Sequence, residues 1–167
     1  MEKADYYIKK LELLSHVEGG AFKEIYRSAL VIPKTELPAE FNGNRNASTA
    51  IYFLLKKGQF SALHKIAADE LWHFYDGDEL CIYEITKAGK LEKHLLGKDL
   101  EKGQSFTCLI KAGSWFGSRC EVKNGFSLVG CTVAPGFDFE DFTLAERATL
   151  LEEYPQYSVL IKELTYS

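Results

Sequence analysis

The sequence predicts an all-β domain, with one helix before the β region and further helices after it. Three observations predict this fold class: β-type runs recur at about 8–12-residue intervals, glycine-containing turns separate them, and aromatic residues make up 13% of the chain. Aromatic side chains suit the half-buried surface of a pleated sheet. A length of 167 residues fits a single domain, 1–167.

The first elements follow in order along the chain. Apolar residues at near-helical spacing predict a helix over residues 4–15, which ends before Gly19-Gly20. The β region covers about 20–134. Its expected strands are the runs 22–27, 49–55, 60–66, 71–75, 80–85, 91–96, 106–110 and 126–133. Turns are expected between them at 56–58, 76–78, 88–90, 102–103 and 123–125.

The pattern changes after Pro135. Thr143 and Glu146 have the spacing of a capping box, which predicts that a helix begins there. This helix is expected to end before Pro155, and a second short helical segment follows, so that C-terminal helices occupy about 143–164.

The charge balance argues against a nucleic-acid partner. The formal net charge is −4 and the isoelectric point is about 5.6, whereas binding to a phosphate backbone needs clustered Lys and Arg. The basic pairs at 9–10 and 56–57 stay isolated. No membrane partner is expected either, because the longest apolar run, 50–55, is far shorter than the ~20 residues that span a bilayer.

The N-terminal residues and the cysteines favour a cytoplasmic location. Residues 1–5 lack the basic and apolar regions of a signal peptide. The four cysteines form no Cys-x-x-Cys pair, which excludes a zinc ribbon or a thioredoxin-type motif. We expect reduced thiols. Three of them lie in apolar runs, where cysteine acts as a small hydrophobic residue.

The stretch 58–77 carries the strongest candidate chemistry. Strand alternation places Ala62, His64 and Ile66 on one apolar face, which we expect to be the barrel interior. A histidine there is either a core residue satisfied by one hydrogen bond or, if the interior is open, a base or a ligand. Glu70 follows a short turn, so the chain folds back towards His64. An acid on an inward face must be paired or kept neutral. The alternative interpretation is that Glu70 is a solvated turn residue.

The position of His73 depends on the strand register. Alternation puts Glu70 and His73 on opposite faces of their strand. A simple hairpin between residues 68 and 69 would place His73 directly opposite His64. Both Glu70 and His73 reach one pocket only if a β-bulge intervenes or Glu70 precedes the regular pairing. The sequence leaves this register open.

The spacing around His64 resembles a known motif. The first motif of the cupin superfamily reads glycine, five residues, His-x-His, three or four residues, Glu, six residues, Gly. Gly58, His64, Glu70 and Gly77 match four of its five anchors. Ile66 stands where the motif has its second histidine.

A weaker match to the second cupin motif begins at Gly103, with a spacing two residues longer than the family's. It reaches Phe116, where the family has a metal-binding histidine. The wider sequence resembles the cupin family called domain of unknown function 985, of the cupin-5 type. The blocks that carry this resemblance span most of the chain and lie at 16–28, 48–55, 60–78, 112–118 and 127–142.

This resemblance implies a double-stranded β-helix, or jelly-roll barrel, with a pocket inside it, and a homodimer. It implies no activity. A typical cupin metal centre uses three histidines and one glutamate, of which only His64 and Glu70 are present here. No cofactor is therefore expected, because two protein ligands hold a transition metal poorly. A divalent metal would need His73 as a third ligand.

Three functions remain open, because a fold does not fix a function. The first is a small-molecule-binding cupin whose ligand is a polar metabolite such as a nucleotide or sugar nucleotide. The second is a metal-free epimerase or isomerase on a keto-sugar nucleotide or similar metabolite, by analogy with epimerases of this fold. In that function His64 is the base, Glu70 orients it, and Tyr52 or Tyr75 is the acid. The third is a metal-dependent oxygenase.

Further residues are candidate ligand contacts. Glu24 lies three residues before Arg27, so strict alternation points one of the two inward unless both lie at a solvated edge. Ser48 either starts an apolar strand or supplies a hydroxyl at the barrel mouth. Trp115 and Phe116, flanked by glycines, are expected to form an aromatic turn at the pocket rim, where they stack on a ligand or close the core.

Overall fold

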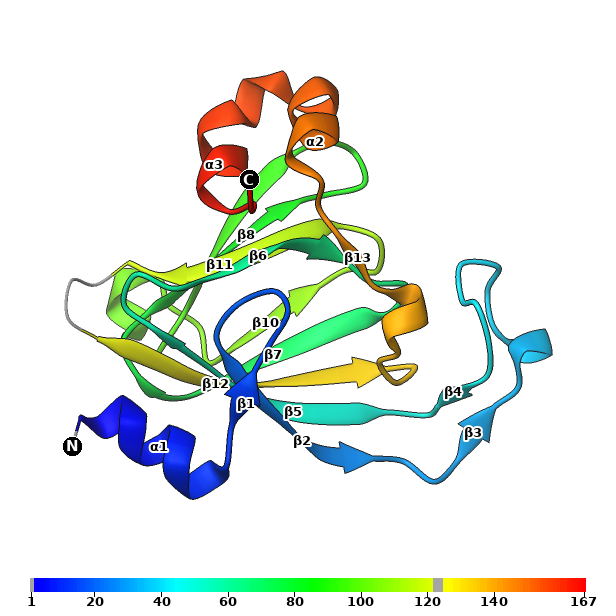
Figure 1. The fold of residues 1–167 in the computed structure, drawn as a ribbon, viewed down its shortest axis with the longest axis horizontal. Coiled ribbons are helices and arrows are strands. Elements are labelled where there is room, and N and C mark those ends of the chain that lie inside the picture. The colour runs from blue at the N-terminus through cyan, green and yellow to red at the C-terminus, as the bar shows by residue number, and fades with distance from the viewer. Residues whose placement is uncertain (1, 122–124) are drawn as a thin grey trace.

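Two antiparallel sheets face each other around a common core in the computed structural model, which describes residues 2–121 and 125–167 (Figure 1). The strands are β1 (Leu14–Ser15), β2 (Ala21–Arg27), β3 (Val31–Ile32), β4 (Arg45–Asn46), β5 (Thr49–Lys56), β6 (Phe60–Lys65), β7 (Asp69–Gly77), β8 (Leu80–Ile85), β9 (Leu91–Leu96), β10 (Thr107–Ile110), β11 (Trp115–Cys120), β12 (Phe126–Ala134) and β13 (Thr143–Leu144). The larger sheet has the order β1-β2-β5-β12-β7-β10, and the smaller one β13-β6-β11-β8-β9. The pair β3-β4 forms an arm that extends from one end of the barrel (Figure 1).

The core lies between the two sheets, because each strand alternates an inward apolar side chain with an outward one. Phe53 and Trp72 come from the larger sheet, and Ile82 and Phe116 come from the smaller one, all with at most 1% of their surface exposed. The Phe53 and Phe116 rings both lie edge-on to the Trp72 ring, at centroid distances of 5.9 and 6.3 Å.

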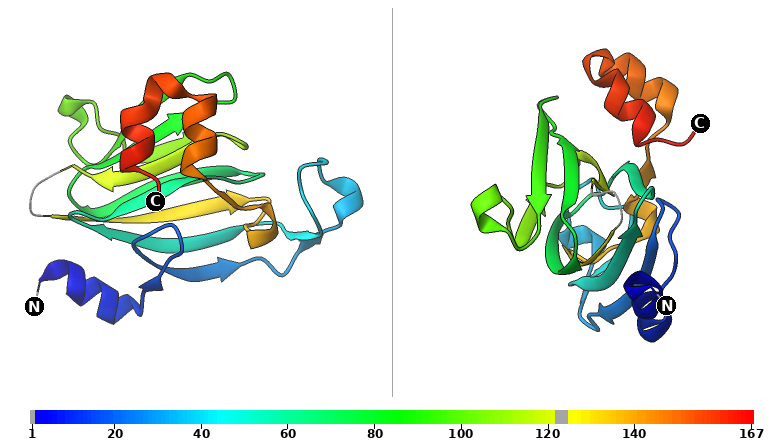
Figure 2. Two further views of the ribbon diagram at one scale, coloured as in Figure 1. Left: turned by 45° about the horizontal axis from the view of Figure 1, so that its top comes forward. Right: turned by 90° about the vertical axis from the view of Figure 1, so that its left-hand side faces the viewer.

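Helices cover the outer faces of the sheets. Helix α1 (Lys3–Leu11) packs on the larger sheet against Leu54 and Leu128. Helices α2 (Arg147–Glu153) and α3 (Ser158–Glu163) lie over the smaller sheet (Figure 2), where their apolar side chains meet Leu63 and Trp115. Short 3₁₀ turns lie at η1 (Lys34–Glu36), η2 (Leu100–Lys102), η3 (Phe139–Asp141) and η4 (Pro155–Tyr157).

The predicted fold class is confirmed, and each of the eight predicted runs coincides with a strand. Three local predictions are wrong. The first helix ends at Leu11, where Glu12 takes a left-handed φ of 56°. The expected turn at Trp115-Phe116 is the start of β11, a central strand of the smaller sheet. Residues 123 and 124 of the turn predicted at 123–125 lie outside the described residues.

The third error concerns the capping box. Thr143 belongs to β13, which pairs with Lys65 and His64 of β6, so the following helix begins only at Arg147. Strand pairing therefore takes the backbone groups that the cap would have used.

None of the helices in the described residues is long and apolar enough to span a bilayer.

A β-bulge between β6 and β11 sets the inward face of β6. The register shifts between Phe116, which pairs with His64, and Ser118, which pairs with Ser61. Gly117 makes this possible, because a Cβ there would lie 2.7 Å from the Ser61 carbonyl oxygen. The bulge turns Ser61 to the same side as His64, whereas strict alternation predicts opposite faces.

Candidate active site

A cavity of about 230 Å³ lies inside the barrel, and its lining includes Arg27 and Thr49, the residues at which the larger sheet adjoins the β3-β4 arm. Its lining comes from β2, β5, β6, β7 and β12 and from two loop segments, 16–18 and 137–139. Its titratable lining residues include two histidines and two glutamates, His16, Glu18, His64 and Glu70, beside Glu24, Arg27, Cys131 and Asp138. Ile51, Val133 and phenylalanine rings supply the apolar part of the wall.

Glu18 reaches the cavity because the hairpin between β1 and β2 folds inward. Gly19 and Gly20 take φ values of 110° and 73°, which suit glycine best. The Glu18 carbonyl then accepts a hydrogen bond from the backbone N–H of Ala62 at 2.7 Å, which ties the hairpin to β6. This connection brings a residue from the N-terminal hairpin next to the strand that carries His64.

The Glu18 carboxylate joins two side chains of β6. Its Oε1 accepts a hydrogen bond from the Ser61 hydroxyl at 2.9 Å, and its Oε2 lies 3.1 Å from His64 Nε2. The other ring nitrogen, His64 Nδ1, lies 2.7 Å from the Ala62 carbonyl oxygen, which can only accept, so Nδ1 carries a proton. A neutral His64 therefore presents the Nε2 lone pair to Glu18.

Burial shifts the proton equilibria of this pair. Removal from water raises the pKa of Glu18 to about 7 and lowers the pKa of His64 to about 4, because both charged forms lose hydration. His16 lies on the other side of Glu18, with 3.7 Å between His16 Nδ1 and Glu18 Oε2. Its pKa is also lowered by burial. Near neutral pH the Glu18 carboxyl group consequently gains and loses a proton, while His64 stays neutral.

Glu70 supplies a second acid in the same cavity. It lies on the inner face of β7, opposite Val133, and is buried. Burial, followed by the charge of Glu18, raises the pKa of Glu70 to about 8, although a hydrogen bond with Cys131 acts in the opposite direction. At neutral pH the Glu70 carboxyl group is therefore mostly protonated and can donate a proton.

An aromatic segment lines the cavity where the arm joins the barrel. Phe137 and Phe139 line it, and the Phe139 ring stacks on His16 with a centroid distance of 6.2 Å. Phe142, from the same segment, stacks on the His64 ring at 5.3 Å. These rings thus form an aromatic wall beside His16 and His64.

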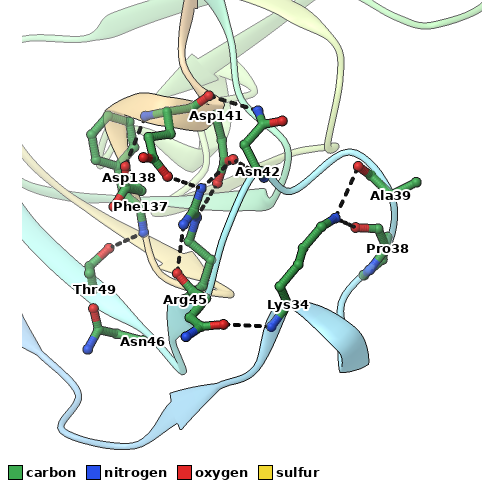
Figure 3. Close-up of polar contacts among 12 residues, drawn as sticks. Lys34, Pro38, Ala39, Asn42, Arg45, Asn46, Thr49, Phe137, Asp138 and Asp141 are labelled. Atoms are coloured by element: carbon green, nitrogen blue, oxygen red, sulfur yellow. Dashed lines mark hydrogen bonds and ion pairs between the residues drawn. The ribbon is translucent and has the colours of Figure 1, made fainter.

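The arm holds this aromatic segment in place (Figure 3). Arg45, with 3% of its surface exposed, donates from Nε and Nη2 to the two carboxylate oxygens of Asp141, at 2.5 and 2.7 Å. Asn42 also binds Asp141 through its backbone N–H, and Thr49 accepts a hydrogen bond from the N–H of Phe137. A buried bidentate pair of this kind fixes the orientation of Asp141 relative to Arg45.

An ion pair lies at the edge of the same cavity. Arg27 donates two hydrogen bonds to the Glu24 carboxylate, at 2.9 and 2.8 Å, and others to Asn46 Oδ1 and to the Phe137 carbonyl oxygen. A bulge between Glu24 and Tyr26 lets both Glu24 and Arg27 border the cavity, whereas alternation predicts only one. The Arg27 guanidinium group therefore forms hydrogen bonds with groups of the protein itself.

The structure brings some of the predicted site residues together. His64, Glu70 and Glu24 line the cavity. Phe116 packs beside it, with its ring centroid 4.1 Å from that of His64, in the core rather than at a rim. Ser48 lies next to the cavity's β5 wall but uses its hydroxyl to bind the Val133 carbonyl oxygen.

Other predicted residues lie elsewhere. His73, Tyr52 and Tyr75 are on the outer face of the larger sheet and do not line the cavity. His73 does not face His64, because β6 and β7 enter different sheets instead of forming a hairpin. On that outer face His73 Nε2 lies 3.1 Å from the Thr132 hydroxyl, and Tyr52 contacts Tyr75 edge-on. Trp115 lies on the outer face of the smaller sheet under the C-terminal helices. These four residues do not border the cavity.

The cavity residues do not fit a cupin metal centre. Two of the four ligand positions hold the buried apolar side chains of Ile66 and Phe116. The two nitrogens of His64 already face the Ala62 carbonyl and Glu18. His73, the expected third ligand, is on the wrong face of β7. We therefore derive no chemical step through a metal in this cavity.

Sequence reasoning missed Glu18 and His16 as residues of the site. The block 16–28 did contain a signal, since it places His16 and Glu18 directly before Gly19-Gly20, a pair that favours a sharp turn. The spacing alone could not predict that Glu18 contacts His64, because these two residues are 46 positions apart in the sequence.

Comparisons with known proteins agree with this fold. Residues 5–145 match the family model described as Cupin superfamily (DUF985). Protein SO0799 from Shewanella oneidensis is 41% identical, with a TM-score of 0.89 and 99% of each chain covered. A hypothetical protein from Leishmania major is 33% identical, with a TM-score of 0.89 and coverage of 99% of this chain and 100% of that one. The uncharacterized protein YML079W of Saccharomyces cerevisiae is 30% identical over 146 residues, 81% of this chain and 72% of its own.

Proposed function

The chain belongs to the cupin superfamily, in the family described as DUF985, and we propose that its cavity binds a small neutral carbonyl compound and transfers a proton at the carbon beside the carbonyl group. This is isomerase or epimerase chemistry. The observation that carries the proposal is the 3.1 Å contact between Glu18 and His64 Nε2 inside a buried cavity that also holds Glu70.

The Glu18–His64 pair is the base. A general base works best when its pKa is near the working pH, and burial brings the pKa of Glu18 to about 7. The pair takes the proton from carbon, and the C–H electrons form a C=C bond. Glu70, protonated at neutral pH, donates its proton to the carbonyl oxygen, so the product of this step is a neutral enol. Return of a proton to carbon completes an isomerisation or epimerisation.

The cavity's size and charge favour a small neutral ligand. Its volume of about 230 Å³ is below the roughly 300–1,000 Å³ of pockets for drug-sized ligands. Arg27 is the one lysine or arginine among the described lining residues, and Glu24 already binds its guanidinium. A phosphate group would meet carboxylates without a free cation. A sugar or a small ketose therefore suits the cavity better than a nucleotide sugar does.

Exchange of carbon-bound hydrogen tests this proposal. Chelator-treated protein is incubated in D₂O with a panel of neutral aldoses and ketoses from three to six carbons, and deuterium on carbon is measured by mass spectrometry. We expect enzyme-dependent exchange with one or more of them. Glu18→Gln and His64→Gln should each slow it at least ~100-fold, because general base catalysis contributes about 10²–10⁴.

The matched control is His73→Gln, which changes the same residue type on the outer face of the larger sheet and should leave exchange unchanged. Exchange that His64→Gln does not slow would overturn the assignment of the base. Ligands that raise the melting temperature without exchanging would instead leave binding as the function of this cavity.

A further inference from the structure

A second cluster of histidine and glutamate lies on the inner face of β8 and β9, away from the cavity. Glu84 on β8 pairs directly across the strands with Glu92 on β9, and His94 lies two residues further along β9 on the same face. One donor atom from each of these three side chains lies within 4.8 Å of the other two. Three strand positions thus aim two carboxylates and one imidazole at a common point.

The charges in this cluster are poorly balanced. Glu84 has 4% of its surface exposed, and in the described part of the chain its ion-pair partner is His94, with 2.9 Å between Glu84 Oε2 and His94 Nε2. Like charges directly opposite each other on paired strands destabilise a sheet, and Glu92 lies opposite Glu84. The Lys90 ammonium lies 3.0 Å from Glu92 Oε1, but the Lys90 side chain is 74% exposed.

A buried carboxylate must be paired, hydrogen-bonded or bound to a metal. His94 alone offers Glu84 at most one positive charge, and the second carboxylate adds to the imbalance. A divalent cation between the three donors would balance both carboxylates. Glu92 and His94 are partly exposed, so an ion has a path from solvent to this point.

We propose that Glu84, Glu92 and His94 form a binding site for a divalent first-row transition-metal ion such as Zn²⁺. One imidazole nitrogen and two carboxylate oxygens are ligands that such ions accept. Three protein ligands leave a position for water on the solvent side, as in zinc sites that are not closed. Binding would displace Lys90 from Glu92, which costs little because that contact is exposed.

Neighbouring groups define the limits of this site. Phe116 pairs with Glu84 on one side and with His64 on the other, so its buried ring separates the cluster from the cavity. The Cys108 sulfur is not among the donor atoms that lie within 4.8 Å of one another, so Cys108 is not one of the proposed ligands.

Zinc titration of the full chain tests the proposal. Protein stripped with a chelator and dialysed is titrated with Zn²⁺ in competition with a chromogenic chelator. We expect one Zn²⁺ per chain. His94→Gln and Glu92→Gln should weaken binding by more than ~100-fold, since even partners of metal ligands contribute about 10–100-fold. Both positions are partly exposed, so these variants should fold, which circular dichroism verifies.

Two further histidine variants locate the ion. His73→Gln, on the outer face of the larger sheet, should bind Zn²⁺ like the unchanged protein, and so should His64→Gln. Absence of stoichiometric binding, or unchanged affinity in His94→Gln, would overturn the proposal. Loss of zinc in His64→Gln together with retention in His94→Gln would move the ion to the cavity. That result would contradict both this site and the metal-free reaction, whereas loss in His94→Gln alone leaves the reaction untouched.

Discussion

Two histidine–glutamate pairs lie on either side of Phe116, and they differ mainly in their access to water. In the cavity, Glu18 and His64 are 3.1 Å apart and both side chains are more than 90% buried. On β8 and β9, Glu84 and His94 are 2.9 Å apart, but 27% of the His94 side chain is exposed. The same residue types at similar distances therefore meet different environments.

The difference shows that desolvation, rather than residue type, decides the chemistry available to such a pair. In the cavity, burial raises the pKa of Glu18 and lowers the pKa of His64, so that the carboxyl group has the higher pKa of the two. This reversed order suits proton transfer. On β8 and β9, two carboxylates beside an accessible imidazole suit exchange of a cation with solvent. Phe116 keeps the two environments apart.

Removal of Phe116 should have the largest effect. Phe116→Ala deletes a ring that is 1% exposed and packs against both Trp72 and His64, so it should lower the free energy of unfolding by about 3–5 kcal/mol. Urea denaturation measures this loss. Phe106→Ala is the matched control, because Phe106 is 52% exposed and its removal should change stability by no more than about 0.5 kcal/mol. An equal decrease in the free energy of unfolding in the two variants would contradict the interpretation of Phe116 as a central core residue.

A smaller effect should appear in the pH dependence of stability. The folded chain raises the pKa of Glu70 from 4.5 to about 8, so it retains a proton that the unfolded chain has lost. The free energy of unfolding therefore falls as the pH rises from about 4.5 to about 8. His64, whose pKa is lowered from 6.5 to about 4, acts in the opposite direction below pH 6.5.

We therefore compare urea denaturation at pH 6.5 and pH 8. Glu70→Gln cannot titrate, so it should show a decline that is smaller than that of the unchanged protein by about 1–2 kcal/mol. The control Glu121→Gln changes a partly exposed carboxylate that binds Arg119 and should keep the full decline. An identical decline in Glu70→Gln would mean that Glu70 does not hold a proton in the fold.

The smallest effect is expected at Lys90. Lys90→Ala removes an exposed ion pair with Glu92, so the midpoint of urea denaturation should not change measurably. It should, however, free Glu92 for a metal and strengthen Zn²⁺ binding by no more than about fivefold. Competition titration measures the affinity, with Lys102→Ala as a control that breaks a similarly exposed pair with Asp99. Weaker binding in Lys90→Ala would show that Lys90 supports the cluster.

The sequence predicted those features that depend on neighbours along the chain. Alternation placed His64 inward, and the eight runs became strands, because side-chain period and turn chemistry act locally. The predicted set of pocket residues was less accurate. His73 was placed opposite His64 by a simple hairpin between β6 and β7, which does not form, since these strands enter different sheets. Tyr52 and Tyr75, the candidate acids, lie on the outer face of the larger sheet, where they contact each other.

The sequence by itself determined the fold class, the family and the loss of metal ligands at Ile66 and Phe116. Only the tertiary structure decided which acid meets His64. The bulge at Gly117 turns Ser61 inward, and the Gly19-Gly20 turn folds Glu18 onto β6. The physical reason is that desolvation and pairing act between residues distant in sequence, so the shifted pKa values of Glu18, His64 and Glu70 exist only once the sheets have closed around them.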